Sequence, residues 1–412
     1  MIRTLLLLGA TGDLARHYLL PALGALEEAG RLPDGLRVVG GADTALDDEG
    51  FRRLAGDALP PDMLAYRAVD LANPASLAAG LDGTHEPVAV YLALPPAVFA
   101  TTIESLGELG LPAGSRIVVE KPFGDDADSA AALNALLAKT GDDAYRVDHV
   151  LGMETTRNLV AVRRDNAVVE RIWNSETVEE VQILWEETLG LEGRAGYFDR
   201  AGALKDVLQN HMLQLLTLVG LDVPADDDDQ HQRKLDVLRS VRVAPGARRA
   251  RYTAGTLADG RDVAAYAEEQ GVDPARRTET FTEVVVELET RRWRGTRFVL
   301  RAGKALARRC KLVRLSFRGG GELQIGIDGP DDVVLRLRGA SSHPLELRSS
   351  PAGAGLPAYA HVLLDVLGGT SALSVGGEEA EQAWRVVAPV LADWETGETP
   401  LEEYPAGSTG PS

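Results

Sequence analysis

The chain has 412 residues, and its 62 acidic against 43 basic side chains give a formal net charge of −19. This charge disfavours binding to nucleic acid or to an anionic membrane surface, because the phosphate groups of both would be repelled. Hydrophobic residues make up 45% and charged residues 25% of the chain, which is typical of a folded globular protein and not of a disordered or fibrous one. The length predicts two domains.

The cysteine count and the lengths of the apolar runs indicate the cellular compartment of the protein. Cys310 is the single cysteine, so neither an intramolecular disulfide nor a thiolate metal site is expected, and a reducing cytoplasm fits. No apolar run approaches the ~18 residues of a membrane span. The apolar start leads into a glycine turn instead of a cleavage site, so we interpret it as a first strand.

The first ~150 residues have the order of elements that a dinucleotide-binding fold requires. The apolar run Leu5–Leu8 leads into the turn 9–15 (GATGDLA), and a helix-like stretch continues to Ala29. Further apolar strand signals alternate with helical ones, such as 129–139. Residues 1–148 are therefore predicted to form a Rossmann-type, doubly wound parallel sheet.

Residues 149–412 show a mixed pattern. A helical segment covers 203–219, and strand-like runs cover 282–288 and 312–317. We expect an α+β domain with a large, mainly antiparallel sheet. The aspartate-rich stretch 224–232 is predicted to be a solvated loop, and 408–412 a frayed tail.

The glycine turn predicts where a cofactor binds. Gly9 permits the tight turn and Gly12 lets the backbone approach a pyrophosphate, whose charge would meet free amides at the start of the helix. The alternative is a purely structural turn. Asp43, after the expected second strand, would accept hydrogen bonds from ribose hydroxyls but repel a 2′-phosphate, so it predicts NAD, with NADP as the alternative. Asp43 could instead only cap the next helix.

Two histidines lie near carboxylates in the sequence. His149 follows Asp148, and His211 lies five residues after Asp206. Histidine supported by a carboxylate can remove a hydroxyl proton near neutral pH. For a lone histidine, packing in the core would be the simpler interpretation.

Several motifs in order carry a family resemblance. They are the glycine turn, 119–124 (VEKPFG), 148–149 (DH), 187–190 (ETLG), 209–211 (QNH), 301–304 (RAGK) and 404–408 (YPAGS). Together they resemble the glucose-6-phosphate dehydrogenase family over nearly the whole chain. The resemblance implies a Rossmann domain joined to an α+β domain whose sheet usually forms a dimer interface, and oxidation of a sugar or sugar phosphate at C1 to the lactone. A homodimer or homotetramer is therefore expected.

The resemblance also implies roles for single residues. His211 matches the general base, Asp148 the carboxylate that pairs with it, and Lys121 a lysine between sugar and nicotinamide, followed by a cis Pro122. Substrate-binding roles are implied for His149, which matches a phosphate ligand, and for Glu187, Asp206, Lys304 and Arg309. The predicted cofactor-binding residues are Gly9, Thr11, Gly12, Asp13, Leu14, Asp43, Ala93, Leu94, Pro95, Glu120 and Lys121.

The predicted roles agree with the chemistry of the reaction. Hydride leaves C1 readily only as the hydroxyl proton departs, so a base must stand on one side of C1 and the nicotinamide on the other. Asp206 and His211 are five apart on the expected helix, too far round to pair well, so Asp148 is the better partner.

The phosphate-binding segment departs from the family pattern. Val150 and Met153 stand where the family usually has tyrosine and lysine, and they are counted among the substrate-contacting positions. Losing a buried charged partner typically costs ~2 to 5 kcal/mol. We therefore expect a substrate that lacks the 6-phosphate. The alternative is an authentic glucose-6-phosphate dehydrogenase in which Arg157, Arg308 or Arg309 replaces the missing groups, or in which both changes are harmless packing variants.

Two readings of other classes are weaker. The residues His149, Glu187, Asp206 and His211 could bind a metal ion, but no close paired-ligand spacing supports it, so no metal is expected. A non-catalytic sensor or scaffold that binds dinucleotide is disfavoured by the presence of Lys121, Asp148 and His211 together. Trp185 is expected to pack in the core, or else to fill space near the sugar.

Overall fold

The computed structural model describes residues 1–81, 84–141, 143–193, 195–328, 333–338, 344–349 and 355–412. The chain forms two compact units. The first contains Met1–Glu154, Asp226–His231 and Gly355–Glu381, and the second contains Thr155–Ala225, Gln232–Ala354 and Gln382–Ser412. Among the described residues, no helix is both long and apolar enough to cross a membrane.

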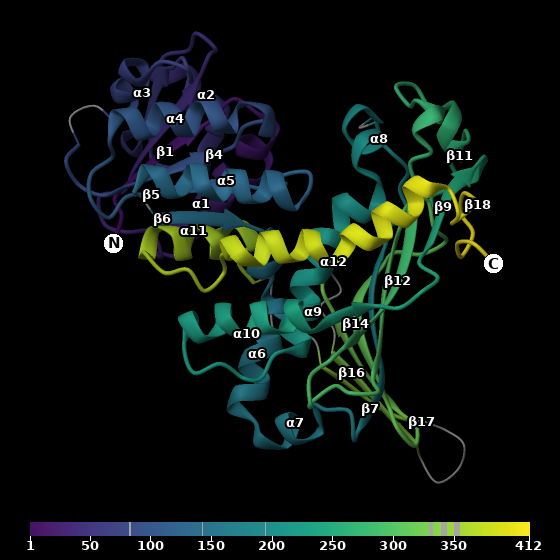
Figure 1. The fold of residues 1–412 in the computed structure, drawn as a ribbon. Helices are drawn as coiled ribbons and strands as arrows, with labels where there is room; N and C mark the ends of the chain where they lie inside the picture. Colours follow the sequence, from purple (N-terminus) through teal and green to yellow (C-terminus); the bar gives the residue numbers. More distant parts are fainter. Residues whose placement is uncertain (82–83, 142, 194, 329–332, 339–343, 350–354) are drawn as a thin grey trace. The chain divides into compact units, whose positions relative to one another are not determined.

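The first unit is built on a parallel six-stranded sheet with the strand order β3-β2-β1-β4-β5-β6 (Figure 1). Leu5–Leu8 are fully buried, as expected for a strand covered by helices on both faces. The predicted Rossmann-type sheet is confirmed. Its strands are β1 (Thr4–Leu8), β2 (Arg37–Ala42), β3 (Leu64–Ala68), β4 (Val88–Leu92), β5 (Arg116–Glu120) and β6 (Asp143–Val147).

Local signals set the ends of the helices in this unit. The best example is α5 (Ala127–Thr140), where Asp126 and Ser129 form a capping box and Gly141 ends the helix at a φ of +75°. The other helical segments are η1 (Ala15–Leu19), α1 (Leu20–Glu28), α2 (Asp48–Ala55), η2 (Gly56–Ala58), η3 (Pro61–Met63), α3 (Pro74–Leu81), η4 (Pro96–Val98), α4 (Phe99–Leu109) and η5 (His149–Gly152).

One late helix belongs to the core of the first unit. The helix α11 (Ala358–Gly368) contributes Val362, Leu363 and Val366, which are fully buried in the same apolar cluster as Leu5. A domain boundary at residue 148 does not account for this segment, because the apolar face of α11 is buried among residues that lie more than 200 positions earlier.

The second unit contains a ten-stranded mixed sheet among the described residues, with the order β17-β16-β15-β14-β7-β13-β12-β9-β18 and β8 paired to β12. Only β7 with β13 and β9 with β18 are parallel pairs. The predicted α+β class with a mainly antiparallel sheet is confirmed. The strands are β7 (Val178–Glu186), β8 (Val241–Val243), β9 (Arg248–Thr253), β12 (Phe281–Leu288), β13 (Arg297–Gly303), β14 (Cys310–Phe317), β15 (Glu322–Gly326), β16 (Val333–Arg338), β17 (Pro344–Ser349) and β18 (Leu401–Pro405).

Alternating side chains orient this sheet. On β14, Val313 and Leu315 are buried and pair with the buried Ile183 and Val181 of β7, whereas Arg314 and Gln182 pair on the opposite face. The buried face packs against the helical segment η6 (Leu204–Met212).

The remaining elements are α6 (Glu154–Asp165), α7 (Ala167–Ile172), α8 (Ala195–Ala203), α9 (Leu213–Gly220), α10 (Asp227–Ser240), η7 (Tyr266–Glu268), η8 (Pro274–Arg276), the pair β10 (Gly255–Thr256) and β11 (Asp262–Val263), and α12 (Gly377–Thr396).

Two local predictions were wrong. The stretch 224–232 is not all loop, because the side chain of Asp226 accepts a hydrogen bond from the backbone of Asp229 and so caps the start of α10. The tail 408–412 is not frayed. The carbonyl of Ser408 accepts a hydrogen bond from the amide of Ala307, and the Arg248 guanidinium donates to the carbonyl of Ser412.

Candidate functional site

The glycine turn after β1 has the geometry that a dinucleotide site needs. Gly9 has a φ of +84°, and a Cβ there would lie 2.2 Å from the carbonyl oxygen of Ala93. The amide of Gly12 donates to the carbonyl of Gly9 over 2.9 Å, and the helix begins directly afterwards. Only glycine tolerates both the backbone conformation and the close approach at position 9. The turn therefore presents a helix start at the carboxyl end of β1.

A cavity of about 840 Å³ opens beside this turn. Its volume is in the range of small-molecule and cofactor pockets. Seven of the predicted cofactor-binding residues line it, while Asp13, Leu14, Glu120 and Lys121 are not among the described lining residues. The seven are Gly9, Thr11, Gly12, Asp43, Ala93, Leu94 and Pro95.

Carboxylates mark one part of this cavity. Asp43 follows β2 and Asp70 follows β3, and both are exposed lining residues. The described lining residues include no lysine, arginine or histidine. Carboxylates are the acceptors that ribose hydroxyls meet in sites for NAD.

Glu120, at the end of β5, lies in a buried polar cluster that the sequence did not indicate. Its carboxylate accepts a hydrogen bond from the hydroxyl of Tyr91 over 2.5 Å. Burial raises the pKa of Glu120 to about 7, although the hydrogen bonds from Tyr91 and Tyr359 and the charge of Lys121 oppose the rise. The peptide bond between Lys121 and Pro122 is cis, as the resemblance implied.

The Asp148–His149 segment follows β6 in the first unit. Asp148 is buried, and its Oδ1 accepts a hydrogen bond from the amide of Val150 over 3.1 Å. The ring of His149 stacks on that of Tyr359, with centroids 5.7 Å apart and planes inclined by 17°. The side chain of Val150 is fully buried. Position 150 therefore serves packing in this unit, whereas Met153 is partly exposed.

In the second unit, His211 lies on a helix of unusual winding. The segment η6 is a π-helix, whose backbone hydrogen bonds join residues five apart. Asp206 and His211 are therefore one turn apart, and the argument that five residues are too far round the helix is wrong, because it assumed α-helical winding. His211 is buried, and its ring stacks on the indole of Trp185 with centroids 5.3 Å apart.

Glu187 and Lys304 form an ion pair near the ends of two parallel strands. Glu187 follows β7 and Lys304 follows β13, and their charged atoms are 2.6 Å apart. A second ammonium, that of Lys311 on β14, lies 3.1 Å from the other carboxylate oxygen. Burial alone would raise the pKa of Glu187, but the charges of Lys304 and Lys311 outweigh it and lower this pKa to about 2. Glu187 is therefore ionised at neutral pH.

Lys311 also joins Glu187 to a further pair. Its ammonium lies 3.2 Å from Asp328, which also binds Arg309, and 4.3 Å from the ring centroid of Trp185. We call these groups the Glu187 cluster: Glu187, Lys304, Arg309, Lys311 and Asp328. Lys311 is not among the residues predicted from the sequence. The available signal was its place in the apolar row of β14, where a lysine is unusual.

Two further candidate cations, Arg308 and Arg157, are exposed. Arg308 has a side chain that is 70% exposed and lies 3.8 Å from Glu186. Arg157, on α6, is exposed. Arg309, the third predicted substitute, is connected to Glu187 through Asp328 and Lys311.

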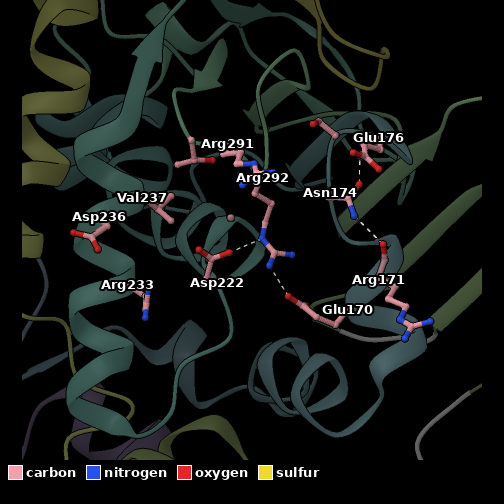
Figure 2. A pocket seen from close by; sticks show the side chains of 13 residues that line it. Glu170, Arg171, Asn174, Glu176, Asp222, Arg233, Asp236, Val237, Arg291 and Arg292 are labelled. Carbon is pink, nitrogen blue, oxygen red and sulfur yellow. Dashed lines mark hydrogen bonds and ion pairs between the residues drawn. The ribbon is translucent and has the colours of Figure 1, made fainter.

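The second unit has a separate cavity of about 520 Å³ (Figure 2). None of its described lining residues was predicted to be a site residue. Arg292 reaches Asp222 and Glu170 there, each over 2.6 Å, as Figure 2 shows. The charged groups of Arg292, Asp222 and Glu170 in this cavity thus pair with one another. It is lined by Glu170, Arg171, Asn174, Ser175, Glu176, Gly220, Asp222, Arg233, Asp236, Val237, Thr290, Arg291 and Arg292.

The parallel sheet, the glycine turn and the cavity beside it define a dinucleotide-binding protein. Family models narrow the class. Residues 6–158 match the NAD binding domain of glucose-6-phosphate dehydrogenase, and residues 160–349 and 339–412 match the C-terminal domain of the same family. The chain belongs to the glucose-6-phosphate dehydrogenase family, and it is an NAD(P)-dependent oxidoreductase of that family.

Individual relatives agree over nearly the full length. The chain is 35% identical to a glucose-6-phosphate 1-dehydrogenase of Rhizobium meliloti, covering 98% of this chain and 93% of the relative. It is 31% identical to that of Dickeya dadantii, covering 99% and 94%. A solved glucose-6-phosphate dehydrogenase in complex with its substrate glucose-6-phosphate matches with a TM-score of 0.89 and 28% identity, covering 100% of this chain and 96% of the other. The predicted family resemblance is confirmed.

Proposed function

We propose that the protein oxidises the C1 hydroxyl of glucose 6-phosphate to the lactone and transfers hydride to a nicotinamide cofactor. The observation that carries the proposal is the ion pair of Glu187 and Lys304 in the same unit as the stacked pair of His211 and Trp185. An ionised carboxylate and a buried ammonium are suited to orient sugar hydroxyls, and histidine is suited to remove a proton. Family membership supports a sugar phosphate as the substrate class.

His211 is proposed as the base that takes the C1 hydroxyl proton. A nicotinamide cofactor, when bound, supplies the acceptor for the hydride. Asp148 stays our predicted partner for the protonated histidine, because a carboxylate stabilises an imidazolium. Lys121 stays predicted to lie between sugar and nicotinamide.

We infer a preference for NAD over NADP from the cavity of the first unit. Asp43 and Asp70 are exposed there, and carboxylates accept hydrogen bonds from ribose hydroxyls but repel a phosphate. Family membership alone leaves the choice open.

A phosphorylated substrate is now the better proposal than the unphosphorylated sugar expected from Val150 and Met153. The relatives that match over more than nine-tenths of this chain carry the name glucose-6-phosphate 1-dehydrogenase. The Glu187 cluster also holds cations, one of which position 153 lacks. A purely structural dinucleotide-binding protein would have no need for these groups.

The proposal is tested by mixing the purified protein with glucose 6-phosphate and either cofactor. Reduced nicotinamide is followed by absorbance, and the lactone or its hydrolysed acid is identified by mass spectrometry. We expect that reduced nicotinamide accumulates and that the lactone or its acid is detected. Turnover of unphosphorylated glucose together with no reaction of glucose 6-phosphate would overturn the proposed substrate.

A further inference from the structure

Lys311 occupies an unusual place in the large sheet. The register pairs it with Trp185 across β14 and β7, in the same row as the buried residues Val313 and Leu315. Its side chain is 10% exposed. Moving an ammonium out of water is costly unless charged partners compensate it, so a lysine at this position needs an explanation.

Within the Glu187 cluster, whose members are all described residues, positive side chains outnumber negative ones. Glu187 is already paired with Lys304 over 2.6 Å, and Asp328 is already paired with Arg309. Lys311 is the additional cation on both carboxylates, at 3.1 and 3.2 Å. The Glu187 cluster thus has three positive and two negative side chains, which leaves one positive charge for an anionic ligand.

Trp185 fixes the ammonium from a third side. The ammonium lies 4.3 Å from the centroid of the indole ring, and the same ring stacks on His211. A cation over an indole face is attracted by the ring quadrupole. The side chain of Lys311 is therefore held in place before any ligand binds, which reduces the ordering cost of binding.

We infer that Lys311 binds the phosphate group of the sugar substrate and sets the preference for a phosphorylated sugar. This inference rests on the proposed function. Because Arg309 also binds Asp328, this carboxylate keeps a partner when the ammonium of Lys311 donates to a phosphate. Lys311 would thus supply the cation that position 153 lacks, although it lies about 160 residues later in the chain.

The test compares Lys311→Met and Lys311→Arg with the unmodified enzyme, using glucose 6-phosphate and glucose as separate substrates. We expect Lys311→Met to raise KM for glucose 6-phosphate by about 30-fold or more, as expected when one partner of a buried charge pair is removed. Turnover of glucose should fall far less than turnover of glucose 6-phosphate, because glucose carries no phosphate for Lys311 to bind, and Lys311→Arg should restore much of the affinity for the phosphorylated sugar. The ratio of kcat/KM for the two sugars is the decisive quantity.

The matched control is Arg314→Met on the same strand. Arg314 lies on the opposite face and binds Gln182 and Glu322, so its loss removes a charge from β14 without touching the Glu187 cluster. Equal losses with both sugars in Lys311→Met would show that Lys311 only holds Glu187, and would overturn the inference. An unmodified enzyme that preferred glucose would instead overturn the proposed substrate. A preference for glucose 6-phosphate that Lys311→Met left intact would overturn only the role of Lys311.

Discussion

The indole ring of Trp185 lies against the imidazole ring of His211, with centroids 5.3 Å apart and planes inclined by 23°. The strand β7 thereby supports the proposed base from the side of the sheet. We predict that Trp185→Leu lowers kcat by roughly 3- to 10-fold, the worth of an aromatic contact, and also raises KM for glucose 6-phosphate, because the same indole ring holds the ammonium of Lys311. Trp185→Phe should retain most of kcat. Steady-state kinetics check this, and equal kcat values for the leucine and phenylalanine variants would contradict a role for the stack.

Removing the base should stop the chemistry without loss of cofactor binding. His211→Asn is predicted to lower kcat by about 10²- to 10⁴-fold, the usual contribution of a general base. The affinity for the cofactor, measured by fluorescence titration, should stay unchanged because the cavity lies in the first unit. Unaltered turnover in this variant would exclude His211 as the base.

Cofactor choice should respond to Asp43. We predict that Asp43→Ser raises kcat/KM with NADP by about 10-fold or more relative to NAD, because the repulsion of a 2′-phosphate is removed. Asp34→Ser, which changes another exposed aspartate of the same unit, is the control and should leave the ratio as it is. A preference for NADP in the unmodified enzyme would contradict the assignment to NAD.

Glu120 should make stability depend on pH. Its pKa is raised from 4.5 to about 7 in the folded state, so the folded protein holds this proton more tightly than the unfolded chain. This group therefore favours folding most below pH 4.5, and its contribution falls by about 3 kcal/mol as the pH rises to 7. Glu120→Gln cannot ionise, so its stability relative to the unmodified protein should be higher at pH 8 than at pH 5.

Urea unfolding at both pH values measures this difference. Glu108→Gln, at an exposed position of α4, is the matched control and should show no such change between pH 5 and pH 8. If Glu120→Gln changed the free energy of unfolding by the same amount at both pH values, the carboxyl of Glu120 would not be protonated more readily in the folded state.

The parts of the site that one short stretch of sequence determines could be predicted, whereas the parts that depend on residues distant in sequence could not. The turn at Gly9 and Gly12 was predictable because one short stretch of sequence carries the strand, the turn and the helix start. Lys311 was not, because its meaning depends on the register that places it beside Trp185, 126 positions earlier in the chain. The π-winding around His211 was hidden for the same reason, since the apolar pattern predicts a helix but not its pitch.

The two local errors have a related cause. Aspartates in 224–232 suit a loop as well as a helix start, and the cap from Asp226 to Asp229 decides between them. The last residues were predicted to fray, yet Ser408 and Ser412 bind groups distant in sequence. Hydrogen bonds that the residue types do not reveal decided both cases: a local cap in the first, and bonds to residues distant in sequence in the second.

The proposed reaction makes one direct claim, that hydride leaves C1 of glucose 6-phosphate. The measurement is the isotope content of the reduced cofactor after turnover of glucose 6-phosphate carrying deuterium at C1. We predict that the reduced nicotinamide contains the deuterium and that the turnover is lost in His211→Asn. Reduced nicotinamide without deuterium, or no reduction of either cofactor by this sugar phosphate, would contradict the proposed function.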